Sequence, residues 1–380
     1  MISKLPETTD SIFSVMSRLA LTYNAMNLAQ GFPDFDPDSQ LCELVHKAMK
    51  NGRNQYAPMP GLLQLREEIA LKTQACYGHL PDAQTEITVT AGATQALFTA
   101  IQALVHPGDE VILLDPAYDA YDPAVRLAGG LPIHVPMAFS NGAFHFDWNA
   151  VKEAMNPKTK LLLLNHPNNP SGTTLKLDDI KAITNLMQQF PFLVLSDEVY
   201  EHMVFDDQPF LSLFRFPEIR QRCMVVSSFG KTYHSTGWKI GYIIGPALLS
   251  NEFRKVHQFN VFSVNTPMQQ AYADFLSVDK SYEQLPSFYQ QKRDLFIDIL
   301  QNSRFKFVPT EATYFQLADY SDIAQDNDID FTQQLVADKK LSLIPLSPFM
   351  AVDKQYKLVR FCFAKSDSFL KSAGDQICQL

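Results

Sequence analysis

The chain has 380 residues, 46% of them hydrophobic, so it can bury a large core and is expected to form two or three domains. Its 32 basic and 41 acidic residues give a net charge of −9 with no basic cluster, which argues against nucleic acid or an anionic membrane as the main partner. Five scattered cysteines without metal-ligand spacing indicate a reduced, cytoplasmic location, and no segment approaches the roughly 18 to 20 consecutive apolar residues that cross a bilayer.

Between residues 85 and 245, short apolar runs alternate with helical stretches, which predicts βα units on a largely parallel sheet. The clearest strands are expected at 87–90, 110–114, 160–164, 192–196, 224–226 and 240–244. From about residue 285 the pattern predicts a helix at 289–300 and strands at 305–308, 314–317 and 357–363. This change indicates a smaller α+β domain, completed by the first 35 residues.

The ligand sites of open α/β sheets lie outside the carboxyl ends of the strands, so the residues that follow the first two strands are candidates. Gly92 opens a helix that is expected to reach about residue 105. The exposed N–H groups of such a helix start favour a phosphate, although an ordinary strand-to-helix turn has the same sequence. Tyr118 stands three residues beyond the second strand and either stacks on a flat ring or packs in the core.

The third and fourth strands end in amide and carboxyl side chains. Three asparagines lie within residues 165–169, and Asn169 can donate a hydrogen bond to a phenolate oxygen. Asp197 ends a fully apolar run, where a carboxylate needs a cationic partner such as a protonated ring nitrogen, and Tyr200 can reach the oxygen of the same ring. A metal cluster of Asp197, Glu198 and His202 is the less favoured alternative, and we expect no metal ion.

The segment 227–239 lies between two predicted strands and should be a loop fixed at both ends. It combines Lys231 and Lys239 with serines and glycines, and Gly230 leaves room for a planar ligand. A desolvated lysine such as Lys231 can react with an aldehyde, whereas a surface loop is the plain alternative. Taken jointly, the amine, the acid, the phenolate donors, the stacking ring and the phosphate cup match pyridoxal 5′-phosphate.

Over essentially its whole length the chain resembles fold-type I, pyridoxal 5′-phosphate-dependent class I/II aminotransferases, through segments 27–35, 54–61, 168–172, 197–200, 227–239 and 359–361. Within that family it is most similar to the kynurenine aminotransferase and glutamine transaminase branch, and above all to bacterial methionine-preferring aminotransferases, through 54–59, 228–234 and 262–267. The resemblance implies an α/β, aspartate aminotransferase-like fold. Residues 36–280 would form the large domain with a mostly parallel central sheet, and residues 1–35 and 281–380 the smaller α+β domain.

The same resemblance implies roles for individual residues. Lys231, Asp197 and Tyr200 would be catalytic, with Lys231 bonded to the cofactor and moving the proton, and Asp197 paired with the pyridine nitrogen. The cofactor would also be held by Gly92, Ala93, Thr94, Tyr118, Asn169, Ser228, Lys239 and, from the partner subunit of a homodimer, Tyr56. The substrate would contact Gly31, Phe13, Phe32, Asn169, the carboxylate-binding Arg360 and, from the partner subunit, Phe262.

The implied reaction moves the amino group of an uncharged amino acid to a 2-oxo acid by a ping-pong mechanism, with methionine preferred and aromatic or other neutral donors also used. Ser263 stands where animal kynurenine enzymes carry a histidine, and no second pocket arginine for a dicarboxylate is evident. His166 has no interpretation from the sequence. A C–S β-lyase acting on cystathionine or cysteine conjugates, a kynurenine or glutamine transaminase, and a regulator that only senses the cofactor are the alternatives.

Overall fold

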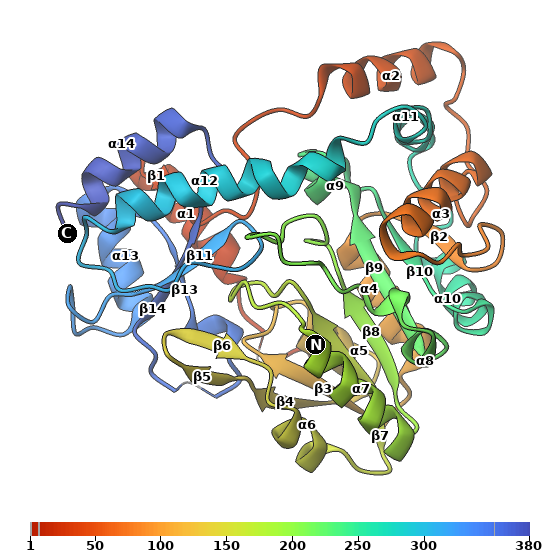
Figure 1. Cartoon of the computed structure of the whole chain (residues 1–380), viewed down its shortest axis with the longest axis horizontal. Helices are drawn as coiled ribbons and strands as arrows, with labels where there is room; N and C mark the ends of the chain where they lie inside the picture. Colours follow the sequence, from red (N-terminus) through yellow and green to blue (C-terminus); the bar gives the residue numbers. More distant parts are fainter. Residues whose placement is uncertain (1, 7, 353) are drawn as a thin grey trace.

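A seven-stranded sheet is the central element of the computed structural model, which describes residues 2–6, 8–352 and 354–380 (Figure 1). Strand β10 is antiparallel to both of its neighbours, and the other pairs are parallel. The mostly parallel α/β sheet is therefore confirmed, and its predicted strands are correct within two residues at each end. In spatial order the strands are β2 (Ile87–Thr90), β10 (Gly241–Ile244), β9 (Cys223–Ser228), β8 (Leu193–Asp197), β7 (Thr159–Asn165), β3 (Glu110–Asp115) and β4 (Leu131–Pro136).

Strand β7 shows why the sheet is covered on both faces. Successive side chains of a strand point to opposite faces. Leu161 and Leu163 belong to the core cluster that includes α4 (Ala93–Leu104) and α5 (Tyr121–Leu127), whereas Leu162 and Leu164 belong to the cluster that includes α7 (Leu177–Gln189). A continuous apolar run is the sequence pattern that such a doubly buried parallel strand requires.

Further helices and a hairpin surround this sheet. The helices are α2 (Ser39–Lys50), α3 (Leu63–Tyr77), α6 (Trp148–Ala154), α8 (Pro217–Arg220), α9 (Phe229–Thr232), α10 (Ala247–Asn260) and α11 (Thr266–Leu276), with 3-10 turns η1 (Leu213–Arg215), η2 (Thr236–Trp238) and η3 (Ser281–Gln284). The hairpin is formed by β5 (Ala138–Ser140) and β6 (Ala143–His145). The segment 227–239, expected to be a plain loop, thus contains α9 and η2.

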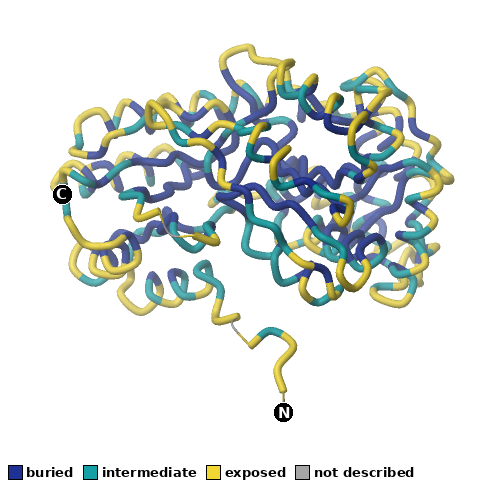
Figure 2. The backbone as a smooth tube through the Cα atoms, turned by 90° about the horizontal axis from the view of Figure 1, so that it is seen from below, coloured by how far each residue is buried: buried dark blue, intermediate teal, exposed yellow. Residues whose placement is uncertain are grey.

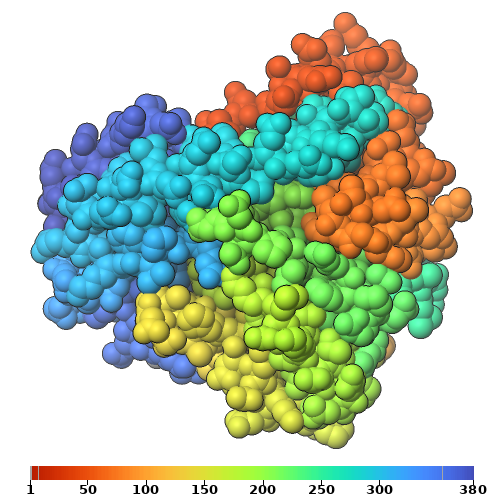
Figure 3. All heavy atoms as spheres, viewed as in Figure 1, coloured from red at the N-terminus to blue at the C-terminus, as the bar shows by residue number. Residues whose placement is uncertain are grey.

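A second, smaller sheet is antiparallel, with β14 (Leu358–Cys362) between β11 (Phe315–Asp319) and β13 (Ile344–Pro345). Helices α12 (Leu285–Leu300), α13 (Asp328–Lys339) and α14 (Asp367–Ile377) and the turn η4 (Ser347–Phe349) belong to the same part of the chain. Near the N-terminus, α1 (Ile12–Tyr23) packs on α13, and β1 (Met26–Asn27) pairs with β12 (Leu341–Ser342). In Figure 3 the last residues of the chain, in blue, gather on one side of the molecule, and those in cyan extend from there across the top. These contacts support the proposed domain division, in which residues 1–35 join 281–380.

The strand predicted at 305–308 is wrong. Only an isolated bridge between Lys306 and Asp319 forms there. The side chain of Gln316 explains the difference, because its amide nitrogen donates to the carbonyl of Val308 at 2.8 Å and its oxygen accepts from the N–H of Thr310 at 3.0 Å. A side-chain amide thus takes the place of a partner strand, and the intervening proline has no N–H to offer.

Burial follows the two sheets. Figure 2 shows buried backbone running through the interior of the molecule, whereas residues 2–4 extend away from it and are exposed. Among the described residues, no helix combines the length and apolar character needed to cross a membrane.

A buried ion pair anchors the sheet next to the strand ends. Lys72 Nζ on α3 lies 2.9 Å from Glu201 Oε1, and both side chains are 3% exposed. The hydroxyls of Tyr77, Ser227 and Tyr242 also donate to Glu201. Burial alone would raise the pKa of Glu201, but Lys72 and the hydroxyl donors lower it to about 2. The network joins Glu201, which directly follows Tyr200, to Ser227, which directly precedes Ser228.

We expect Lys72→Met to lower the free energy of unfolding by about 3 to 5 kcal/mol, because it leaves the Glu201 carboxylate buried without its cation. Urea denaturation would measure the loss. The matched control is Lys181→Met, which removes an exposed pair with Asp178 and should cost less than about 1 kcal/mol. Equal losses in the two variants would contradict the importance of the buried pair.

Candidate active site

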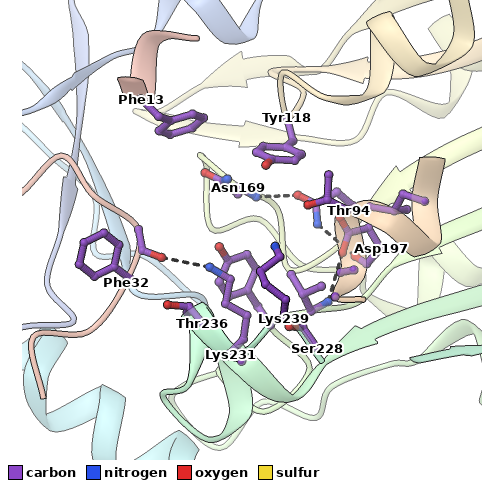
Figure 4. A pocket seen from close by; sticks show the side chains of 18 of the residues that line it. Phe13, Phe32, Thr94, Tyr118, Asn169, Asp197, Ser228, Lys231, Thr236 and Lys239 are labelled. Carbon is purple, nitrogen blue, oxygen red and sulfur yellow. Dashed lines mark hydrogen bonds between the residues drawn. The ribbon is translucent and has the colours of Figure 1, made fainter. Parts of the chain in front are cut away.

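The carboxyl ends of β7, β8 and β9, together with the N-terminus of α4, border a cavity of about 240 Å³. Figure 4 shows Phe13 and Tyr118 on one side of it and Lys231 and Lys239 on the opposite side. The predicted site residues that line the cavity are Phe13, Gly31, Phe32, Gly92, Ala93, Thr94, Tyr118, Asn169, Asp197, Tyr200, Ser228, Lys231, Lys239 and Arg360. Strand-end positions distant in the sequence therefore meet at one place.

Two predicted residues do not line this cavity. Tyr56 is 82% exposed and Phe262 is 54% exposed, and their rings contact each other with centroids 5.4 Å apart. Both were expected to act from a partner subunit. Their exposure in a single chain agrees with that expectation, which stays a prediction.

Lys231 is a partly buried amine held by neutral acceptors. Its Nζ donates to the carbonyl of Gly31 at 3.0 Å and to the hydroxyl of Tyr314 at 2.9 Å. Burial and the positive charges of Arg360 and Lys239 lower the pKa of Lys231 to about 8, although Asp197 acts in the opposite direction. An amine in this position can therefore be neutral, and hence nucleophilic or basic, near physiological pH.

Asp197 ends β8 as a buried carboxylate. Its Oδ2 accepts a hydrogen bond from the hydroxyl of Tyr121 at 2.7 Å, and its Oδ1 accepts one from the N–H of Val199 at 3.3 Å. Burial raises the pKa of Asp197 to about 6, against the lowering effects of Tyr121, Val199 and Lys231. The group is thus ionised at neutral pH and can hold a cation, such as a protonated ring nitrogen.

Arg360 on β14 is a fully buried guanidinium. Its Nη1 donates to Asn169 Oδ1 at 2.6 Å and its Nη2 to the carbonyl of Ala29 at 2.8 Å, while its Nε has no partner among the described residues. Burial lowers the pKa of Arg360 below its ordinary value, and the ring centroid of Phe315 lies 3.9 Å from Cζ. A buried cation bonded only to neutral oxygens is suited to an incoming carboxylate.

Asn169 lines the cavity, and its amide nitrogen has no acceptor among the described residues. Its Oδ1 is taken by Arg360, and its backbone N–H donates to Asn165 Oδ1 at 2.8 Å. Asn165 in turn donates from Nδ2 to the carbonyl of Asp197 at 3.0 Å. This chain of hydrogen bonds ties the ends of β7 and β8 together and leaves the Asn169 amide nitrogen as a donor for a ligand oxygen.

Gly92 and Lys239 form a cradle at the start of α4. Gly92 has φ +80°, and a Cβ at this position would lie 3.3 Å from Lys239 Cε and 3.4 Å from Lys239 Nζ. The ammonium thus lies against a helix N-terminus, which itself carries positive partial charge. An anion between them removes this conflict, and Ser228 adds a hydroxyl to the same cavity. The donor set fits a phosphate group.

Aromatic rings form the opposite wall. Phe13 and Tyr118 lie with ring centroids 6.2 Å apart, and Phe315 also lines the cavity. Phe32 is 45% exposed at its mouth. The flat face of Tyr118 can stack on a planar ligand, and the remaining rings favour an apolar side chain.

Sequence reasoning did not single out Tyr121 or Tyr314, and it noted Asn165 without a role of its own. The one feature of the sequence that could have indicated Tyr121 is its position three residues after Tyr118. Tyr314 precedes a strand, where an aromatic residue is usually part of the core. Gly230 was expected to make room for a planar ligand, and it lines the cavity. A Cβ at this position would also lie 3.0 Å from the Cα of Thr236, so close packing within the loop favours a glycine here as well.

The alternative metal cluster of Asp197, Glu198 and His202 is not supported. No group of three or more potential ligands suited to a metal ion occurs among the described residues. Glu198 Oε1 lies 3.3 Å from His166 Nε2, away from the cavity, and accepts from Ser196 at 2.8 Å. His166 is completely buried and stacks on Phe210. It packs behind the site and does not line it.

A phosphate cradle, a carboxylate for a ring nitrogen, an amine of lowered pKa and a guanidinium for a carboxylate together define an enzyme that binds pyridoxal 5′-phosphate beside an amino acid. The aminotransferase class I and II family matches residues 23–376, and the chain belongs to this family. It is therefore a pyridoxal 5′-phosphate-dependent aminotransferase, an enzyme that uses amino acids and 2-oxo acids as substrates.

Known relatives agree with this assignment. The chain is 48% identical over 379 residues to the methionine aminotransferase of Escherichia coli, covering 100% of this chain and 98% of the relative. It is 33% identical to human kynurenine–oxoglutarate transaminase 3, covering 99% of this chain and 89% of that one. A crystal structure of YbdL from Escherichia coli, described as having a methionine aminotransferase function, matches with a TM-score of 0.96 and 46% identity over 100% of this chain and 99% of that one. The predicted fold and family are confirmed.

We expect the neutral, reactive form of Lys231 to appear with a midpoint near pH 8, because the pKa of Lys231 is lowered to about 8. The pH dependence of its acetylation in cofactor-free enzyme, followed by peptide mass spectrometry, would measure this value. Lys239→Met removes a positive charge that lowers this pKa, so its midpoint should be higher. A midpoint near 10.4, about that of a lysine in water, would contradict the assigned environment.

Proposed function

We propose that the enzyme transfers the amino group of methionine, and of other apolar or aromatic amino acids, to a 2-oxo acid by a ping-pong mechanism. The observation that carries the proposal is the composition of the cavity. Arg360 is the one arginine among the described residues that line it, and Phe13, Phe32 and Phe315 also line it. One guanidinium suffices for the α-carboxylate, and aromatic rings suit a thioether or an aromatic side chain. The similarity to the Escherichia coli methionine aminotransferase supports the same donor.

We assign the chemistry as follows. When bound, pyridoxal 5′-phosphate supplies an aldehyde that attaches covalently to amines and a ring that accepts the electrons of the Cα–H bond. Asp197 would hold the ring nitrogen as a cation, and Asn169 and Tyr200 would bind the ring oxygen. Lys231 would take the proton from the substrate Cα and donate it again, a task for which a pKa near 8 is well matched. Arg360 fixes the substrate carboxylate and thereby the direction of the Cα–H bond.

The remaining residues hold the cofactor in place. We propose that Tyr118 stacks on the ring, and that the backbone N–H groups at the start of α4 bind the phosphate with Ser228 and Lys239. Lys239 neutralises the phosphate charge that the helix N-terminus attracts. The residues given this task at the helix start are Gly92, Ala93 and Thr94.

A homodimer would complete this site. Tyr56, Phe262 and Phe259 expose large aromatic side chains, with Phe259 86% exposed on α10. We propose that this aromatic group packs against a second copy of the chain and that the partner subunit's Tyr56 reaches the phosphate.

The five cysteines, all free in the structure, support the reduced environment of the cytoplasm as the place of the reaction.

A panel of amino donors with one common 2-oxo acid would test the substrate. We expect methionine and aromatic donors to react faster than aspartate, because the cavity offers no second arginine to a side-chain carboxylate.

The Lys231→Ala variant should lose transamination while keeping the fold, as judged by circular dichroism. Faster turnover with aspartate than with any apolar donor would reject the proposal, and release of pyruvate and ammonia from cystathionine as the main activity would favour the C–S lyase.

Complementation would test the shared site. We expect Tyr56→Ala and Lys231→Ala to be poorly active when produced separately. Coexpressed, the two chains should form hybrid dimers in which one site has its own Lys231 and the partner subunit's Tyr56. Activity above the sum of the separate variants supports the proposal, whereas strict additivity in a demonstrated mixed dimer would contradict it.

A further inference from the structure

The hydroxyl of Tyr121 makes a short contact with the carboxylate of Asp197. Tyr121 begins α5 and Asp197 ends β8, and the donor hydroxyl lies 2.7 Å from Oδ2. Tyr121 is 2% exposed and Asp197 is 5% exposed, and both line the cavity. The ring of Tyr121 also meets that of Tyr118 edge to face at 5.6 Å. Packing therefore leaves the Tyr121 hydroxyl little freedom to point elsewhere.

Few groups stabilise the charge of Asp197. From its own loop, Val199 donates one N–H and Glu198 adds a repulsive charge, while Lys231 on α9 acts from a longer distance. Burial raises the pKa of Asp197 to about 6, and Tyr121 opposes it more strongly than Val199 or Lys231 does. Without the Tyr121 hydroxyl, protonation of Asp197 would extend further into the neutral pH range.

The contact has a fixed direction. Burial and the nearby Asp197 raise the pKa of the Tyr121 hydroxyl well above its ordinary value, so Tyr121 keeps its proton and always donates. A hydrogen bond of this kind is stronger to a carboxylate than to a carboxylic acid. It also occupies one lone pair of Oδ2, so the remaining lone pairs of Asp197 point to other sides.

We propose that Tyr121 is a positioning residue for transamination: its hydroxyl stabilises the carboxylate form of Asp197 and directs the free lone pairs of Asp197 toward the ring nitrogen of the cofactor. The proposal rests on the ring-nitrogen role assigned to Asp197. Through Asp197, Tyr121 keeps the shared proton on the ring nitrogen, where it increases the capacity of the ring to accept electrons.

The test is the isosteric variant Tyr121→Phe, loaded with pyridoxal 5′-phosphate labelled with ¹⁵N in the ring. We expect its ¹⁵N resonance to move from the protonated toward the neutral position, and kcat with methionine to fall about 10- to 100-fold, as for loss of a hydrogen bond to a charged group. The matched control is Tyr289→Phe, which deletes a fully buried hydroxyl without a partner among the described residues. Its resonance should stay at the wild-type position.

A cofactor analogue with carbon in place of the ring nitrogen separates positioning from a general structural effect. Tyr121→Phe should bind this analogue as tightly as the wild type does. Loss of analogue affinity as large as that for pyridoxal 5′-phosphate, or an unmoved ¹⁵N resonance, would overturn the proposal for Tyr121. Asp197→Ala distinguishes the underlying assignment: if its resonance also stays unmoved, the role of Asp197 itself fails, whereas a moved resonance there leaves only Tyr121 rejected.

Discussion

Charges that are buried with neutral hydrogen-bond partners are the constraint on which the site depends. Lys231, Asp197 and Arg360 all bond to neutral groups, and each has its pKa displaced toward the uncharged form. Such charges are costly in a protein interior. The pair of Lys72 on α3 and Glu201, which follows Asp197 by four residues, shows the opposite solution, in which the protein supplies both partners. In the cavity the second partner is left to the ligands.

The fold meets this cost by using rigid elements from distant parts of the sequence. The residues proposed to hold the cofactor lie at the ends of parallel strands, and both faces of these strands are buried. Arg360, proposed to bind the substrate carboxylate, comes from the smaller sheet, and Gly31 comes from the segment that β1 ties to β12. Lys231 donates to that same Gly31 carbonyl. The position of the amine therefore depends on both the large sheet and the N-terminal segment.

Much of this arrangement could be predicted from the sequence because strong apolar runs locate the strands and polar residues follow them directly. Asp197 and Asn169 were found this way, while Arg360 and Phe13 depended on the family resemblance. Contacts between side chains of different elements could not be read from spacing, which is why the hydrogen bond from Tyr121 escaped notice. The strand expected at 305–308 failed for a related reason, since the side chain of Gln316 on β11 bonds to the backbone carbonyl of Val308.

The antiparallel direction of β10 has a mechanical consequence. The chain leaves β9 and enters β10 at the same edge of the sheet, where the N–H of Phe229 donates to the carbonyl of Ile240 at 3.2 Å. The segment that carries Lys231 and Lys239 is thus a loop whose two ends are held together by the pairing of β9 with β10. It does not cross from one end of the sheet to the other, as the connection between two parallel strands must. Lys231, the proposed reactive amine, and Lys239, which lies beside the N-terminus of α4, both belong to this loop, so an insertion that moves one of them would also displace the other.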